Sequence, residues 1–288
     1  MNASAKLGGF AATLAVLFGV GALAGGLLDP AGEAPAEATG AAHGEGEHAM
    51  AAASAPSVRG LAVAADGLRL VVETPELHRG ATQRLAFQIV DERGRTVRHF
   101  DVEHTKRMHL ILARRDLTSF AHLHPEQRPD GTWTTTARLD QAGSYRLFAD
   151  FSHEGRAVTL ASDLRVDGAA DLRPLPAPRP TASTDGGYAV RLDAGAVRPG
   201  VASELRFTVT KDGVPVHTEP YLGAGGHLVA LRDGDLAFLH VHPDEHGEGK
   251  GDAIGFGATF PTAGRYRLFL QFRHEGRVHT VAFTQEVS

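Results

Sequence analysis

The stretch Ala142-Gly-Ser-Tyr-Arg-Leu-Phe-Ala-Asp-Phe-Ser-His-Glu-Gly-Arg156 decides the fold, because it returns later as Ala263-Gly-Arg-Tyr-Arg-Leu-Phe-Leu-Gln-Phe-Arg-His-Glu-Gly-Arg277. Alternate positions of such a run share one face of a β-strand, and Glu-Gly after the histidine suits a hairpin turn. Ala-Gly-x-Tyr ahead of a strand resembles the tyrosine corner of immunoglobulin-like sandwiches. The chain is therefore a duplication of a β-rich domain.

Two more elements repeat in the same order on the N-terminal side of this stretch. Met108-His-Leu110 matches Gly226-His-Leu228, and Phe120-Ala-His-Leu-His-Pro125 matches Phe238-Leu-His-Val-His-Pro243. The spacing between the two histidine elements is the same in both copies. Each copy therefore carries four histidines in a shared order.

Short apolar or alternating runs cut by turn signals fill both copies, which is the pattern of a sandwich. The turn signals are Asp66-Gly67, Arg93-Gly94, Asp130-Gly131 and Asp212-Gly213. We therefore predict an all-β protein with two tandem immunoglobulin-like β-sandwich domains after an N-terminal hydrophobic helix. The domains are residues 58–166 and 187–288, and a Pro-rich linker at 167–186 joins them in an extended conformation.

The N-terminal part has the composition of a membrane-targeting segment followed by a polar tether. An uncharged apolar run from Leu7 to Leu28 is long enough to span a bilayer, so residues 1–28 are a transmembrane anchor or a signal peptide cleaved near Ala24. Residues 29–57 form an Ala/Gly/Glu/His linker that is expected to be disordered. Both alternatives place the body outside the cytoplasm; we expect the anchored form at the cell membrane.

Composition excludes several function classes. The chain has no cysteine, which removes disulfides, thiolate zinc sites, iron–sulfur clusters and blue-copper centres. Its formal net charge is −5, so a nucleic-acid partner is not expected. Histidine, with 16 residues, is the metal ligand in excess.

The histidines of each copy are expected to gather on one sheet face. Residues 107–124 read as a hairpin in which His109 pairs with His122 or with His124, depending on the turn. The fourth histidine ends another strand. Three or four neutral imidazoles suit copper(II) or zinc, and spacing alone does not choose between the two ions. We therefore predict two metal sites, one in each domain, with these ligands: His109, His122, His124 and His153; His227, His240, His242 and His274.

Two other interpretations of these histidines remain open. They could form half-buried polar ladders bonded to backbone or to Tyr145 and Tyr266, or they could lie on a partner-binding surface. Histidines without a counterpart in the other copy are expected to be solvated surface residues, and these are His78, His104, His246 and His279. A zinc-dependent hydrolase is a further alternative that would need an open fourth ligand position.

The motifs also resemble a known group of proteins. The runs Asp101–Leu110, Arg114–Pro125 and Pro220–Pro243 are similar to those of uncharacterised actinobacterial proteins with repeated histidine motifs. The resemblance implies a secreted or membrane-anchored protein, and such proteins often sit near copper or heavy-metal handling genes. It covers nearly the whole chain but brings no active-site residues with it.

These observations together predict an extracytoplasmic metal-binding protein without enzymatic activity. It would bind copper(II), with zinc as the alternative, and buffer or deliver the ion at the cell envelope. Its partners would be the metal ion, the membrane and an envelope protein. The alternative is a membrane-anchored structural or partner-binding pair of sandwiches with structural histidines.

Overall fold

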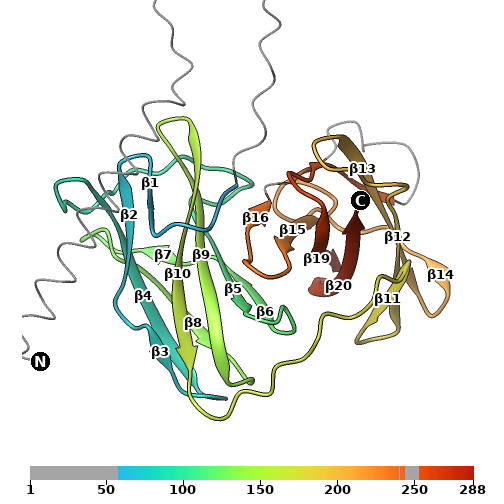
Figure 1. Cartoon of the computed structure of the whole chain (residues 1–288), viewed down its shortest axis with the longest axis horizontal. Helices are drawn as coiled ribbons and strands as arrows, with labels where there is room; N and C mark the ends of the chain where they lie inside the picture. Colours follow the sequence, from blue (N-terminus) through green and yellow to red (C-terminus); the bar gives the residue numbers. More distant parts are fainter. Residues whose placement is uncertain (1–57, 240, 244–252) are drawn as a thin grey trace, which may run out of the picture. The chain divides into compact units, whose positions relative to one another are not determined.

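A computed structural model describes residues 58–239, 241–243 and 253–288, which group into one compact unit containing both repeats (Figure 1). Every element in these residues is a β-strand, as the sequence predicted. Within the same residues, no helix is long and apolar enough to cross a membrane. The predicted N-terminal helix at 1–28 and linker at 29–57 lie outside the described residues.

The first repeat folds into two sheets of five strands each. All pairings are antiparallel except that of the short edge strand β3 with β10. In spatial order, one sheet contains β1 (Ala64–Ala65), β2 (Leu68–Val72), β4 (Thr82–Asp91), β8 (Trp133–Arg138) and β7 (Glu126–Gln127), and the other contains β3 (Glu76–Leu77), β10 (Arg156–Val166), β9 (Gly143–His153), β5 (His109–Arg114) and β6 (Phe120–Leu123).

The second repeat has the same two-sheet plan. Its first strand, β11, starts inside the segment predicted as linker, because Thr181–Thr184 forms a hairpin with β12. In spatial order, one sheet contains β11 (Thr181–Thr184), β12 (Tyr188–Asp193), β13 (Ala202–Lys211), β18 (Ala253–Thr259) and β17 (His242–Pro243), with β14 (Val214–Pro215) paired to β13, and the other contains β16 (Phe238–Leu239), β15 (His227–Arg232), β19 (Gly264–His274) and β20 (Arg277–Val287).

The repeated sequence element folds in the same way in both copies. Tyr145 donates its hydroxyl proton to the carbonyl of Gln141 at 2.9 Å, and Tyr266 donates to the carbonyl of Thr262 at 3.1 Å. These two tyrosine corners confirm the sandwich prediction. The Glu-Gly turns that follow, at 154–155 and 275–276, have positive φ at both positions, as two-residue hairpins require.

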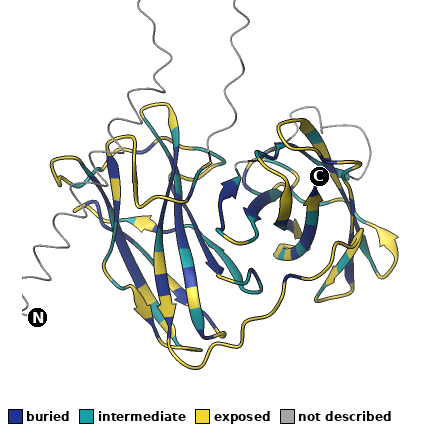
Figure 2. Cartoon of the chain, viewed as in Figure 1, coloured by how far each residue is buried: buried dark blue, intermediate teal, exposed yellow. Residues whose placement is uncertain are grey.

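Three apolar clusters bury the faces of the sheets. One cluster fills the first sandwich and one fills the second. The third combines residues of both repeats, including Ile111 and Phe148 from the first and Val229 and Phe269 from the second. Figure 2 shows how strongly burial concentrates on the strands. The β5–β9 and β15–β19 pairs are therefore covered on both faces.

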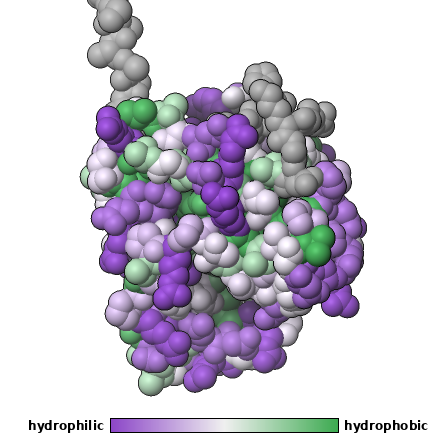
Figure 3. All heavy atoms as spheres, turned by 90° about the vertical axis from the view of Figure 1, so that its right-hand side faces the viewer, coloured by the Kyte–Doolittle hydropathy of each residue, from purple (hydrophilic) through white to green (hydrophobic). Residues whose placement is uncertain are grey.

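The remaining exposed apolar side chains are scattered. Val102, Leu172 and Val214 are each more than half exposed and come from separate parts of the chain. Figure 3 shows a face on which hydrophilic residues predominate and hydrophobic ones are dispersed. The linker contributes to burial, because Leu175 packs into the shared cluster rather than acting as part of a bare spacer.

Candidate metal centre

The strand register decides which histidines can meet. His109 pairs with Asp150 across β5 and β9, and His227 pairs with Gln271 across β15 and β19. Alternate residues point to opposite faces, so each histidine shares its face with residues of the shared apolar cluster. These residues are Ile111 and Ala113 after His109, and Val229 and Leu231 after His227. Both histidines therefore open onto the interface between the repeats.

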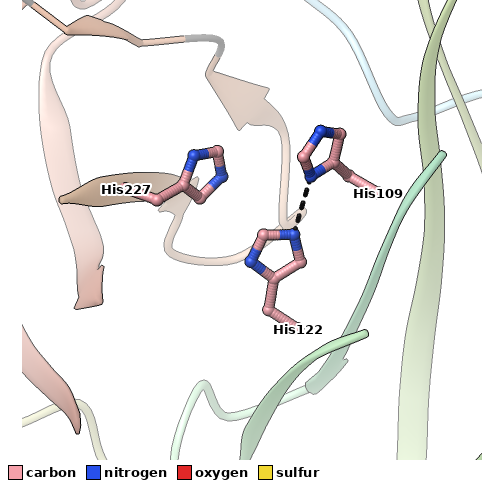
Figure 4. A group of neighbouring side chains, drawn as sticks. All are labelled: His109, His122 and His227. Carbon is pink, nitrogen blue, oxygen red and sulfur yellow. Dashed lines mark hydrogen bonds between the residues drawn. The ribbon is translucent and has the colours of Figure 1, made fainter. Parts of the chain in front are cut away.

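Three imidazoles from the two repeats converge there. The Nδ1 atom of His109 lies 3.0 Å from the Nε2 atom of His122. A ring nitrogen of His227 lies within 4.8 Å of ligand atoms of both (Figure 4). The β5–β6 hairpin pairs Ile111 with His122. This register sets His109 opposite His124, which is the second of the two registers that the sequence allowed. Both His109 and His122 consequently face His227.

Hydrogen bonds behind the rings define how the first two imidazoles are protonated. The Nε2 atom of His109 lies 3.2 Å from the backbone carbonyl of Glu103, which can only accept, so Nε2 carries the proton. The Nδ1 atom of His122 lies 2.7 Å from the side-chain oxygen of Gln271, and the Gln271 amide donates to Thr280. With these partners, the two nitrogens that face each other at 3.0 Å are both acceptors in neutral rings.

A fourth imidazole lies beside this group. The ring centre of His124 is 4.7 Å from that of His122 and 5.2 Å from that of His109. Its Nε2 atom is buried and has no hydrogen-bond partner. Desolvation, aided by His109 and Lys106, lowers the pKa of His124 to about 4. His124 is therefore a neutral imidazole with a ring nitrogen that could bind a metal ion, next to the three-histidine cluster.

Electrostatics keep the rings of His122, His124 and His227 uncharged near neutral pH. Desolvation and the neighbouring imidazoles hold the pKa of His122 and of His227 well below the ordinary value. Burial raises the pKa of Asp150 to about 6, although a hydrogen bond from Thr159 and the attraction of His109 oppose that rise. Neutral imidazole is the form that binds metal ions, so these rings need no deprotonation at neutral pH.

The fourth predicted ligand of each copy lies elsewhere. His153 shares the face of Tyr145 and Phe151, which belong to the interior core of the first sandwich, and its Nδ1 bonds to the carbonyl of His99 at 2.9 Å. His274 likewise faces the second core and bonds to the hydroxyl of Tyr188 at 2.8 Å. His153 lies three residues after Asp150, the strand partner of His109, and His274 lies three residues after Gln271, the strand partner of His227. Because alternate residues of a strand point to opposite faces, this odd separation directs both side chains away from the cluster.

The remaining predicted ligands belong to the second copy. His240 lies outside the described residues, as does the side chain of His242. The backbone of His242 pairs with Gly257 in the opposite sheet of that sandwich. In the part of the chain that the structure describes, one cluster combines His227 of the second repeat with His109 and His122 of the first.

The sequence missed three neighbours of the cluster. Glu103 and Gln271 hold the rings from behind, and Gln271 could have been noticed because it occupies the position of Asp150 in the repeat. His104, expected at the surface, is half-buried, with its ring centre 6.1 Å from His109 and 5.8 Å from His227.

Two other histidines without a counterpart have different surroundings. His78 is exposed and pairs with Asp167, as expected of a surface residue. His279 is not solvated as expected, because its ring packs 4.2 Å from that of Tyr188 and its Nε2 is buried. His246 lies outside the described residues.

Comparisons with known proteins give a family and distant structural similarities. A family model described as a domain of unknown function (DUF8832) matches residues 62–168 and again 182–288. No curated protein matches the chain.

Three bacterial proteins of low identity are among the solved structures that resemble the chain. The Escherichia coli adhesin FdeC is 15% identical over 79% of this chain and 66% of its own, with a TM-score of 0.28. Salmonella alpha-2-macroglobulin is 15% identical over 82% and 15%, with a TM-score of 0.28. Yersinia pseudotuberculosis InvD is 11% identical over 77% and 57%, with a TM-score of 0.26. This chain spans less than two thirds of each of these chains.

Proposed function

The chain belongs to the DUF8832 family, of which it contains two copies, and we propose that the copies jointly bind one divalent transition-metal ion. The ligands are His109 and His122 from the first repeat and His227 from the second. Copper(II) is the preferred ion and zinc the alternative.

The observation that carries the proposal is the pair of facing acceptors. Two neutral imidazoles that each donate behind the ring cannot hydrogen-bond to one another, so a 3.0 Å approach of Nδ1 of His109 and Nε2 of His122 calls for a cation or an extra proton between them. The low pKa of His122 keeps that ring neutral, so an extra proton would have to lie on Nδ1 of His109. Donation of the distal ring nitrogen to a carbonyl or amide oxygen is the usual outer support of a metal-bound histidine.

The all-imidazole donor set favours copper(II) over zinc. Two nitrogens about 2.0–2.1 Å from one ion lie about 2.9 Å apart at a right angle and about 3.3 Å apart in a tetrahedron. The distance of 3.0 Å between Nδ1 of His109 and Nε2 of His122 is compatible with either arrangement, so the choice of ion rests on the donor set. Imidazole sites also bind copper(II) more tightly than zinc in general.

The proposed role is to buffer or deliver the ion at the cell envelope, without catalysis. The apolar run at 7–28 would anchor the chain in the membrane, or be removed near Ala24, and would place both domains outside the cytoplasm. An envelope protein would receive the ion.

A second candidate function is a structural joint, in which the histidines hold two partner-binding domains together. The hydrogen bond between His122 of the first repeat and Gln271 of the second favours it. A joint of this kind needs no ion, so a metal titration separates the two functions.

The experiment titrates the full chain, purified in mild detergent, with copper(II) and separately with zinc. A His43→Ala/His48→Ala background removes the two histidines of the N-terminal segment. Native mass spectrometry is expected to show one tightly bound ion per chain, where two separate sites would give two. His122→Ala should abolish tight binding.

The matched control is His153→Ala, which removes a predicted ligand that faces the sandwich interior and should leave binding intact. Absence of saturable binding, or equal losses in His122→Ala and His153→Ala, would contradict the proposal. In the first case the structural joint becomes the better account.

A further inference from the structure

A tight turn precedes β5, which begins at His109, and an equivalent turn precedes β15, which begins at His227. In the first repeat, the backbones of Glu103 and Lys106 bond to each other in both directions at 2.8 and 2.9 Å, around His104 and Thr105. In the second repeat, Tyr221 and Ala224 bond likewise around residues 222–223. The two turns are equivalent parts of the duplicated domain.

The two turns share a backbone conformation but differ in sequence. Residues 104 and 105 have φ of 47° and 67°, and residues 222 and 223 have φ of 55° and 85°. Glycine suits the second position of such a turn, and the second repeat has Gly223 there. The first repeat instead has Thr105, a β-branched residue for which positive φ is a genuine outlier. The first repeat therefore has His104-Thr105, with a backbone conformation that is unfavourable for threonine, where the second repeat has Leu222-Gly223.

The strained turn holds an imidazole over the cluster. His104 lies edge-on to both His109 and His227, with ring centres 6.1 and 5.8 Å away. Two imidazoles bound to one ion have ring centres between about 4.5 Å, at a right angle, and about 6.4 Å, when opposed. Both distances fall within that span, and the group of ligand atoms within 4.8 Å of one another comprises His109, His122 and His227, so His104 lies beside that group as an outer imidazole. The carbonyl of Glu103, at the start of the same turn, accepts the proton of His109.

The turn is also placed at the boundary between the repeats and solvent. Thr105 and Lys106 are exposed while His104 is half-buried. A side chain added at Gly223 would meet the methyl group of Thr105 at 3.7 Å, so the two equivalent turns lie side by side. Leu222 is buried in its turn, which leaves His104 as the polar group that this pair of turns offers to the cluster.

We propose that His104 is an additional, exchangeable ligand of the ion held by His109, His122 and His227, through which the ion enters and leaves from solvent. This inference rests on the proposed function. Strained backbone clusters at functional sites, and the equivalent turn of the second repeat has glycine at the position of Thr105.

Three variants of the full chain test the assignment. Thr105→Gly relieves the strain and keeps the imidazole. His104→Leu removes the imidazole, and His104→Leu/Thr105→Gly recreates the turn of the second repeat, so that loss of the imidazole is not confused with failure to fold. Copper(II) affinity and release rate are measured by competition with a chromogenic chelator, and bound nitrogens are counted by electron paramagnetic resonance.

Thr105→Gly should raise the unfolding midpoint and keep the affinity. His104→Leu and the double variant should still bind one ion, but about tenfold or more weakly, with faster release and an altered nitrogen hyperfine pattern. A double variant that binds as tightly as Thr105→Gly, with an unchanged spectrum, would overturn the assignment of His104. Failure of the metal-binding function itself would show differently, as absence of binding in the unaltered chain, and would overturn both.

Discussion

Gln271→Leu tests whether the outer hydrogen bond of His122 prepares the site for an ion. The side-chain oxygen of Gln271 accepts the Nδ1 proton of His122 at 2.7 Å, and Gln271 is only 6% exposed, so water cannot readily replace it. Leucine has a similar volume and cannot accept. Without the acceptor, the His122 proton is expected to move to Nε2 and bond to Nδ1 of His109. In that tautomer Nε2 of His122 carries a proton and Nδ1 of His109 accepts it in a hydrogen bond, so neither nitrogen is available to a metal ion.

The magnitude follows from the role of such supporting bonds. Loss of an outer partner of a metal-bound histidine weakens metal binding by about 10- to 100-fold, or about 1.4–2.8 kcal/mol. The stability of the metal-free protein should fall less, by about 1 kcal/mol, because the new bond between the two histidines offsets part of the loss. Gln271→Glu keeps an acceptor and should retain the affinity.

The assay is chelator competition for copper(II), paired with ¹⁵N chemical shifts of the imidazoles, which report the tautomer directly. Gln285→Leu is the matched control, because Gln285 is on the neighbouring strand β20 and its side-chain amide donates to the backbone carbonyl of Glu286, away from the histidines. An unchanged affinity in Gln271→Leu, or an equal loss in Gln285→Leu, would refute the reasoning that the tautomer prepares the site.

Three further predictions concern stability and the interface. Tyr145→Phe should lower the free energy of unfolding by about 1 kcal/mol, since the carbonyl of Gln141 loses its donor, and urea denaturation measures this. Phe269→Ala should lower the free energy of unfolding by about 3 kcal/mol and also weaken copper(II) binding, because Phe269 stacks on Phe120 of the other repeat with ring centres 4.1 Å apart. Phe207→Ala, inside the core of the second sandwich, should lower the free energy of unfolding as much and leave copper(II) binding unchanged. The metal-free protein should lose stability as the pH falls from about 6.5 toward 4, because folding lowers the pKa of buried histidines such as His124 and the unfolded chain then binds more protons. The raised pKa of Asp150 acts in the opposite direction below about pH 6, so a urea midpoint that rises between pH 6.5 and 5 would show that the carboxyl outweighs the histidines.

The sequence alone determined the features that depend on local pattern. The period of two along Tyr145–His153, the Glu-Gly turns and the recurrence of the whole element require strands, hairpins and two equivalent domains. The same alternation predicted that His109 and His122 would share a face. These conclusions need no knowledge of distant contacts, because each follows from neighbouring residues.

Only the tertiary structure decided which face that was and what lies opposite. Both faces of strand β5 are apolar, so the sequence could not tell that His109 opens onto the other repeat while His153 points into its own sandwich. Packing of two sheets through the third apolar cluster brings His227 to the histidines of the first repeat. The proximity of His104 to the cluster was not predicted for another reason. It depends on a turn with positive φ that no residue of the first copy indicates, and only alignment with Leu222-Gly223 of the second copy would have suggested that turn. Alternation assigns residues to faces, but the pairing of faces across repeats is set by where apolar surface can be buried, and that is a property of the folded whole.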